Sequence, residues 1–112
     1  MYVQISIRHM LSSCVNKRAV RELCSEVRNK YANIQFIDVM LEDINGPHKA
    51  GIDKRCHLKV RGKDHLAIDI EDIDEDITCA IDRAFRRLKN ALERYHSYRI
   101  SGHVNGRYSI EA

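Results

Sequence analysis

Ser12 and Ser13 belong to the first group of residues in this chain that could take part in catalysis. They stand beside Cys14 and close to His9, so a nucleophile and a base are near each other in the sequence. Serines that directly precede a helical repeat more often cap the helix, because the hydroxyl accepts hydrogen bonds from amides of the first turn. We therefore interpret Ser12 or Ser13 as a helix N-cap, and we predict no catalytic residues and no enzymatic activity.

A run of carboxylates between Asp69 and Asp76 is the second group with a chemical interpretation. Clustered carboxylate oxygens are the ligands that hard cations prefer. The run lacks the glycine and the ligand spacing of a calcium loop. We interpret it as a solvated strand end followed by an acidic helix N-terminus, which the helix dipole favours.

Cys56, His57 and His65 could be offered as zinc ligands. Adjacent residues of a strand point to opposite faces, so Cys56 and His57 cannot reach one ion without a bulge. The sequence therefore predicts no metal and no other cofactor. The remaining cysteines form no CxxC pair and are interpreted as small buried or half-buried apolar residues: Cys14, Cys24 and Cys79.

Basic side chains that could bind a polyanion are concentrated in two helical segments. Eight of them lie opposite the apolar positions: Lys17, Arg18, Arg21, Arg28, Arg83, Arg86, Arg87 and Arg94. The acids that can neutralise them by i to i+4 pairing are fewer: Glu22, Glu26, Asp82 and Glu93. Arginine predominates, and its planar fork of donors suits phosphate. If both helices cover one side of a sheet, these bases share a polyanion-binding surface. A pair of solvated helix faces is the alternative.

The net charge of +3 is too mild to identify a nucleic-acid binder, but the charges are segregated along the chain. Residues 64–76 contain seven acids and no lysine or arginine, whereas residues 77–112 contain seven such bases and three acids. A basic field of this kind attracts polyanions. No strand has the aromatic-rich surface that stacks splayed bases, so we expect recognition of folded RNA by shape and backbone.

With 112 residues, 44% hydrophobic and 31% charged, the composition is that of one globular domain. No stretch approaches the roughly 20 apolar residues that span a bilayer, and the chain does not start with a basic segment followed by an apolar one. We expect a cytoplasmic protein with no membrane partner and no small-molecule substrate.

Hydrophobic periodicity predicts the elements that position these side chains. Residues 2–8 alternate as a half-buried strand does. Val20, Leu23, Val27 and Tyr31 recur at helical spacing in a helix that ends near Asn33. Residues 34–41 form a second strand, which must stop before the Asn-Gly-Pro turn at 45–47.

The second half of the chain predicts a hairpin followed by a long helix. Strands over residues 52–61 and 65–71 turn at Lys63, which pairs Val60 with Leu66 on the inner face. On the outer face this register predicts two charge pairs, Arg55 with Glu71 and His57 with Asp69. Asp74 caps the helix, and its apolar stripe runs from Ile77 to Tyr95.

The elements therefore follow the order β, α, β, β, β, α. This order predicts an α/β fold, more narrowly an α+β two-layer sandwich, in which a four-stranded sheet has two helices on one face. We expect a single domain over residues 1–96. Residues 97–112 are interpreted as a C-terminal tail that is flexible or adds a short strand.

The stretch LEDINGPHKAGIDKRC at residues 41–56 resembles the ribosome hibernation promoting factor and sigma-54 modulation family. Residues 80–84 and 88–94 of the second helix resemble the same family. The similarity is to a short branch in which an Asn-Gly-Pro turn leads into an Asp-Lys-Arg-Cys strand, and it spans about residues 1–95. The family's order of elements agrees with the one predicted above.

This resemblance implies that the protein binds ribosomal RNA of the small ribosomal subunit, in the channel of messenger and transfer RNA, and silences translation under stress. The helix bases then face RNA, which assigns this role to the eight residues given above. The C-terminal dimerisation domain of the long family members has no counterpart here, so ribosome pairing by that route is not expected. The alternative is a protein-interaction module that regulates transcription or stress proteins through its open sheet face. The sequence leaves the oligomeric state open.

Overall fold

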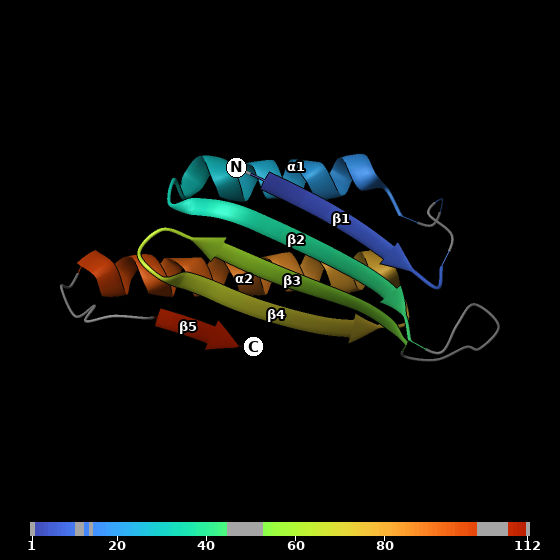
Figure 1. Cartoon of the computed structure of the whole chain (residues 1–112). Coiled ribbons are helices and arrows are strands. Elements are labelled where there is room, and N and C mark those ends of the chain that lie inside the picture. Colours follow the sequence, from blue (N-terminus) through green and yellow to red (C-terminus); the bar gives the residue numbers. More distant parts are fainter. Residues whose placement is uncertain (1, 11–12, 14, 45–52, 101–107, 112) are drawn as a thin grey trace.

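The computed structural model describes residues 2–10, 13, 15–44, 53–100 and 108–111. Within these residues the chain forms five strands and two helices (Figure 1). Their order is β1 (Tyr2–Arg8), α1 (Lys17–Lys30), β2 (Ile34–Asp43), β3 (Lys54–Gly62), β4 (Leu66–Asp74), α2 (Ile77–Ile100) and β5 (Tyr108–Glu111).

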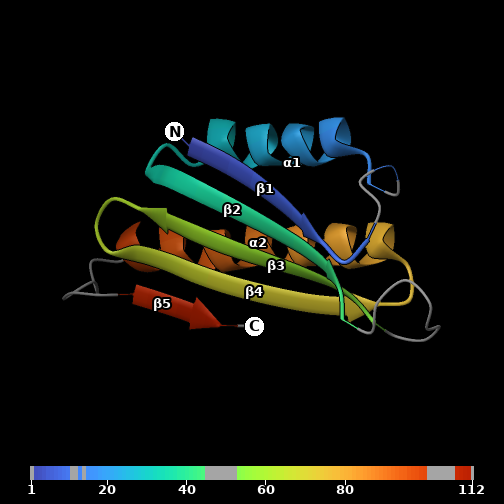
Figure 2. The same cartoon turned by 45° about the vertical axis from the view of Figure 1, so that its right-hand side comes forward.

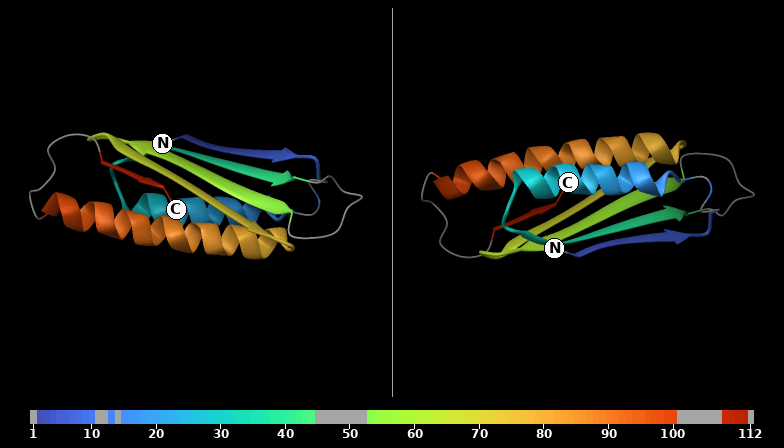
Figure 3. Two further views of the ribbon diagram at one scale, coloured as in Figure 1. Left: turned by 90° about the horizontal axis from the view of Figure 1, so that it is seen from below. Right: turned by 90° about the horizontal axis from the view of Figure 1, so that it is seen from above.

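The strands form one sheet in the order β1-β2-β3-β4-β5. β1 is parallel to β2 and β4 is parallel to β5, whereas β3 is antiparallel to both of its neighbours. A parallel pair needs a crossover connection, and each crossover here contains a helix. α1 and α2 lie side by side over the same face of the sheet, as Figures 2 and 3 show. One sheet face is therefore covered by helices and the other is open.

The predicted element order and the two-layer architecture are confirmed. The four expected strands are present, and Tyr108–Glu111 adds a short fifth strand beside β4, as one interpretation of the tail allows. α2 continues to Ile100 and so passes residue 96, where the sequence places the end of the domain. The Asn-Gly-Pro turn at 45–47 lies outside the described residues.

The core fills the space between the helices and the covered sheet face. Alternate residues of the inner strands point into it, and Ile37, Val39 and Leu41 of β2 are completely buried. α2 adds large side chains, among them Phe85 and Leu88. Burial of one such side chain contributes roughly 1.5–3 kcal/mol. Packing of the helices on the sheet is therefore the main source of stability.

Two cysteines belong to this core, as the sequence predicts. Burial raises the pKa of the Cys24 thiol on α1 to about 11 and that of Cys56 on β3 to about 12. Both thiols therefore stay protonated at neutral pH and pack as small apolar groups. Cys79 is exposed on α2, so the prediction that it is buried or half-buried was wrong. Cys14 lies outside the described residues.

α1 begins later than the sequence predicts. Its N-cap is Asn16, whose side-chain oxygen accepts a hydrogen bond from the Ala19 amide at 3.1 Å. The prediction of Ser12 or Ser13 as the cap was therefore wrong. Asparagine caps a helix as well as serine does, because its carbonyl reaches the same free amides.

α2 also begins later, at Ile77, because β4 extends to Asp74. The cap is Asp76: its carboxylate accepts a hydrogen bond from the Thr78 amide at 2.8 Å, and its carbonyl accepts one from the Ala80 amide at 3.1 Å. The predicted cap, Asp74, instead accepts a hydrogen bond from the Asp76 amide at 3.0 Å. The acidic run thus ends a strand and caps a helix, as predicted. Asp74, however, lies at the strand end, and Asp76 is the cap.

The register of the β3–β4 hairpin differs from the prediction by two residues. Val60 lies opposite Ile68 rather than Leu66. The pairing is centred on Asp64, one residue later than predicted, and the turn residues Asp64 and His65 have φ angles of 60° and 64°. Two consecutive positive φ angles are typical of the tightest hairpin turns, where glycine or asparagine is usual. A shift of two residues keeps every side chain on its predicted face, so the predicted core is unaffected.

Gly62 lies at the end of β3 where the backbone of Asn33 comes close. A Cβ atom at residue 62 would lie 2.2 Å from the Asn33 carbonyl oxygen. The Lys63 amide donates a hydrogen bond to the same oxygen at 2.9 Å. This close approach fixes the end of α1 against the hairpin.

We predict that Gly62→Ala lowers the free energy of unfolding by about 1–3 kcal/mol, because the backbone must move to relieve the overlap. Urea denaturation followed by circular dichroism measures the change. Lys63→Ala is the control, since it truncates an exposed side chain and keeps the backbone hydrogen bond. A Gly62→Ala variant as stable as the parent protein would contradict this close packing.

Candidate nucleic-acid interface

The predicted phosphate-binding residues of α1 are all exposed. Arg18 pairs with Glu22 at 3.6 Å, but the Arg18 side chain is 90% exposed, so the pair contributes little to stability. Lys17, Arg21 and Arg28 form neither a hydrogen bond nor an ion pair within the described part of the chain. These three bases are available to an external anion.

Two of the predicted residues on α2 are held by β4. Asp72 lies on the helix-facing side of β4 and is 8% exposed. One of its oxygens accepts a hydrogen bond from Arg83 Nε at 2.8 Å, and the other accepts one from Arg87 Nη1 at 3.0 Å. Arg83 also donates to Asp74 at 2.7 Å, and Arg87 to the Glu71 carbonyl at 2.8 Å. Their donors are therefore largely occupied inside the protein.

The charges in this cluster support one another. Hydrogen bonds to Asp74 and Asp72 raise the pKa of Arg83. The backbone amide of Asp76, and after it the Arg83 side chain, holds the pKa of Asp74 below its usual value. Asp74 and Arg83 therefore stay ionised at neutral pH, and the hydrogen bonds of the cluster fix α2 on β4.

Arg86 and Arg94 are the other two predicted residues of α2, and both are exposed. Neither forms a hydrogen bond or an ion pair among the residues that the structure describes. The sequence groups all four arginines of α2 as equivalent, whereas the structure leaves these two available.

Two ion pairs join the helices. Lys89 of α2 pairs with Glu26 of α1 at 3.1 Å, and Lys30 of α1 pairs with Glu93 of α2 at 2.8 Å. Tyr31, which follows α1, also donates a hydrogen bond to Glu93. These contacts form a neutral seam and identify the side of each helix that faces the other.

The other bases can be placed relative to this seam, because an α-helix turns by about 100° per residue. They fall into three sets: an α1 flank of Lys17, Arg21 and Arg28, an α2 flank of Arg83, Arg87 and Arg94, and the outward-facing Arg18 and Arg86. The α1 flank lies away from α2, and the α2 flank borders β4. All eight predicted bases thus lie on the layer formed by α1 and α2, which we call the helical layer. Within it, the bases of α1 and those of α2 lie on opposite sides of the seam.

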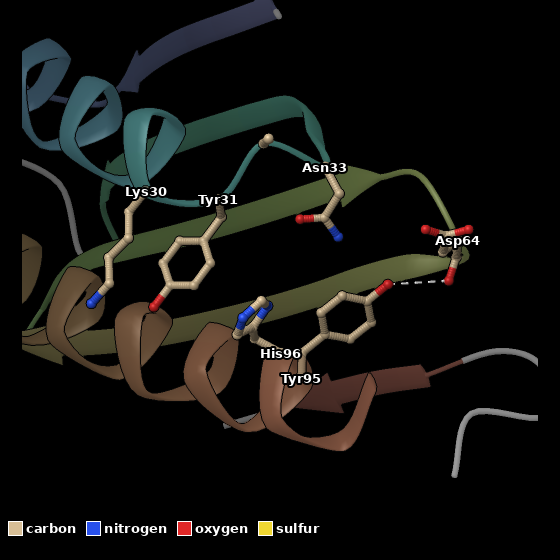
Figure 4. Close-up of a pocket in the computed structure, with 7 residues that line it drawn as sticks. Lys30, Tyr31, Asn33, Asp64, Tyr95 and His96 are labelled. Carbon is tan, nitrogen blue, oxygen red and sulfur yellow. Dashed lines mark hydrogen bonds between the residues drawn. The ribbon is translucent and has the colours of Figure 1, made fainter. Parts of the chain in front are cut away.

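A hollow of about 460 Å³ lies between the end of α1 and the later turns of α2 (Figure 4). Tyr31 and Tyr95 line it, and both are buried. The Tyr95 hydroxyl lies within hydrogen-bond distance of the Lys63 and Asp64 carbonyls, at 3.4 and 3.3 Å. We therefore attribute a structural role to these tyrosines, which fasten the helix ends to the sheet and the hairpin turn.

The open sheet face carries charges that pair across strands. Arg55 pairs with Glu42 of β2 and lies 3.7 Å from Glu71 of β4. His57 Nε2 lies 3.9 Å from an oxygen of Asp69. The two predicted contacts, Arg55 with Glu71 and His57 with Asp69, are thus confirmed, although they run diagonally in the observed register. Arg55 and His57 are therefore balanced by acids, whereas Arg8 and Lys59 of the same face form no ion pair among the described residues.

An aromatic pair on the open face was missed by the sequence analysis. The rings of Tyr2 and Phe36 stack with centroids 5.3 Å apart and planes 5° apart, and Tyr2 is 56% exposed. Both residues occupy outward positions of their alternating strands. That alternation was a usable signal, but each ring is isolated in the sequence and only strand pairing brings them together.

A buried charge cluster at the ends of β2 and β3 was also missed. Lys54 Nζ lies 3.2 Å from Asp43 and 2.6 Å from Asp53, and both carboxylates are almost completely buried. The hydrogen bond to Asp53 is the main cause of the raised pKa of Lys54. The cluster ties the two strand ends together. No periodicity in the sequence predicts it, because the residues come from two separate segments.

The structure shows the geometry that argued against a zinc site, with Cys56 and His57 on opposite faces of the sheet. Cys56 is buried beneath the helices, whereas His57 lies on the open face. No three histidine, cysteine or acidic side chains gather as metal ligands among the described residues. Of the serine and cysteine group near the start of α1, Ser12 and Cys14 lie outside the described residues. Neither helix, as far as it is described, is long and apolar enough to cross a bilayer.

A family model described as sigma-54 modulation protein / S30EA ribosomal protein matches residues 3–100. The chain belongs to this family. The resemblance noted from residues 41–56 and from the second helix is therefore confirmed. The family is one of ribosome-associated factors rather than enzymes.

Two solved structures are similar to this member of the S30EA family. The first is a ribosomal subunit interface protein from Coxiella burnetii, with 17% identity and a TM-score of 0.63, covering 87% of this chain and 99% of its own. The second is the N-terminal domain of Protein Y from Thermus thermophilus, with 22% identity and a TM-score of 0.66, covering 85% of this chain and 99% of its own. At these identities the likeness shows the fold alone. A search of curated proteins finds no significant match.

The seam generates a prediction about pH. Hydrogen bonds from Lys30 and then Tyr31 hold the pKa of Glu93 below its usual value of 4.5. Because the pKa is lower in the folded state, the stabilisation is complete above about pH 4.5 and is lost as the pH falls through the folded-state value.

We therefore predict that Glu93→Gln lowers the free energy of unfolding at pH 7, and that this loss shrinks as the pH is lowered towards about 3. Urea denaturation at a series of pH values measures both effects. Glu22→Gln is a matched control on the exposed side of α1 and should change stability by at most about 0.5 kcal/mol. An equal loss from Glu93→Gln at both ends of the series would contradict the ionised seam.

Proposed function

We propose that this S30EA family member binds ribosomal RNA of the small ribosomal subunit through the helical layer. In this proposal it occupies the channel of messenger and transfer RNA and silences translation under stress, as a cytoplasmic protein without catalytic activity or cofactor. The resemblance of residues 41–56 to hibernation factors supports the site and the effect on translation.

The observation that carries the proposal is the set of bases that the fold leaves unpaired. Five of the eight predicted residues form neither a hydrogen bond nor an ion pair within the described residues: Lys17, Arg21, Arg28, Arg86 and Arg94. A purely solvated helix surface would more commonly be laced with i to i+4 pairs, as Arg18 and Glu22 are. Unpaired arginines beside a neutral seam suit the phosphates of folded RNA.

Two flanks of bases fit RNA better than a single anionic peptide would. The phosphates of a folded RNA run in separate strands across a groove, and recognition of such RNA depends on shape and backbone contacts. We propose that the α1 flank and the two unpaired bases of α2, Arg86 and Arg94, contact different backbone segments. The name of the Coxiella burnetii protein, a ribosomal subunit interface protein, is consistent with this partner.

The test is co-sedimentation with purified small ribosomal subunits across a salt series from about 50 to 500 mM. Neutralised phosphates release counterions, so contacts by the five unpaired bases should give a log–log slope of about −4. The double variant Arg86→Ala, Arg94→Ala should bind more weakly and have a slope shallower by about 1.5.

The matched control is the double variant Arg8→Ala, Arg55→Ala, which removes the same charge from the open sheet face. It should bind like the parent protein. If the parent protein stays at the top of a low-salt gradient while the subunits sediment, the proposed function fails. The protein-interaction module on the open face would then be the better hypothesis. Equal weakening by both double variants would place RNA at the Arg8 and Arg55 end of the open face as well.

A further inference from the structure

The stacked rings of Tyr2 and Phe36 form a flat apolar surface at one end of the open sheet face. β1 is the edge strand of the sheet, so Tyr2 has a strand on one side only. Its ring stacks on Phe36 on that side and remains 56% exposed. A ring stacked on one face and exposed elsewhere can extend the stack by one more planar group.

Polar and charged groups surround these rings. Arg61 lies next to Phe36 in the sheet register, and its guanidinium is held by Asp69 at 3.2 Å. Lys59 lies two residues from Arg61 along β3, between Asp38 and Asp69 in the register. It is exposed and forms no hydrogen bond or ion pair among the described residues. Gln4 accepts a weak hydrogen bond from the Tyr2 hydroxyl at 3.5 Å and has its own amide donors to offer.

We infer that Tyr2 and Phe36 form a stacking site for one unpaired nucleobase, with the exposed Lys59, two residues from Arg61 along β3, as the base offered to the adjoining phosphate. A planar, polar-edged ring linked to an anion matches the exposed ring, the Gln4 amide and the free ammonium together. An apolar peptide side chain would contact only the exposed ring and would leave the Gln4 amide and the Lys59 ammonium without a partner. This inference rests in part on the proposed function, because ribosomal RNA is the partner that would supply the base.

The site differs in kind from the helical layer on the other side of the sheet. Arginines of the helical layer contact phosphates and suit double-stranded RNA, whose bases are already stacked on both faces. Tyr2 needs a base whose face is free, as in a single strand or a loop. The protein would then hold folded RNA on one face and a single-stranded segment on the other.

The experiment is a titration of a fluorescently labelled single-stranded RNA, an adenosine decamer, with the full chain at low salt. Fluorescence anisotropy gives the affinity. Tyr2→Ala should weaken binding by about tenfold, the loss typical of one stacked base, while Tyr2→Phe should retain the affinity of the parent protein. Ile73→Ala is the matched control, because it truncates another exposed apolar side chain elsewhere on the same face.

Direct contact is read from NMR spectra of the ring protons. The Tyr2 and Phe36 signals should move upfield as the decamer is added, and the shift should be absent with a ribose phosphate that carries no base. Equal affinity of Tyr2→Ala and the parent protein, with folding intact, would overturn the inference. So would decamer binding that responds to Arg86→Ala with Arg94→Ala but not to Tyr2→Ala.

Two further outcomes separate this inference from the proposed function. If the decamer binds through Tyr2 but ribosomal subunits do not bind the protein, the proposed function fails and the stacking site stands. If sedimentation velocity shows a dimer of the free protein that Tyr2→Ala dissolves, the aromatic pair is an interface between two copies, and the inference is overturned.

Discussion

The helical layer depends on the hydrogen bonds and ion pairs of the buried Asp72 carboxylate. Asp72 replaces an apolar residue in the helix-facing row of β4 and is only 8% exposed. A carboxylate in that position is costly unless it is paired, and here Arg83 and Arg87, one helical turn apart, each bind one of its oxygens. This contact fixes the rotation of α2 on the sheet and decides which arginines remain free for an external anion.

The other charged side chains of the protein fall into groups with different roles. The seam of Lys30, Glu93, Lys89 and Glu26 joins α1 to α2 and is neutral. The open face balances its basic strand with acids on both neighbouring strands. Among the described residues, the unpaired bases lie mostly on the helical layer, on the α1 flank and at Arg86 and Arg94, while Arg8 and Lys59 are unpaired on the open face. The modest net charge therefore understates how strongly this one surface attracts phosphate.

Alternation and helical periodicity predict the fold, because β2, β3 and β4 each bury one face and each helix buries one stripe. They do not predict the hairpin register, since Asp64 and His65 adopt positive φ angles without being glycine. They also predict which helix faces carry the bases, but not which bases are neutralised. The predicted strand ends at Glu71, one residue before Asp72, so the partner of Arg83 and Arg87 was outside the expected sheet.

The most direct test of this account is the affinity of Asp72→Asn for small ribosomal subunits. Asparagine keeps the shape of the side chain but removes the charge that holds Arg83 and Arg87. Binding should become tighter, with a steeper salt dependence, because two more arginines can turn to phosphates. Asp82→Asn, which makes the same change of charge at an exposed site of α2, should have a smaller effect. Binding that is unchanged or weaker in a folded Asp72→Asn variant would contradict the account.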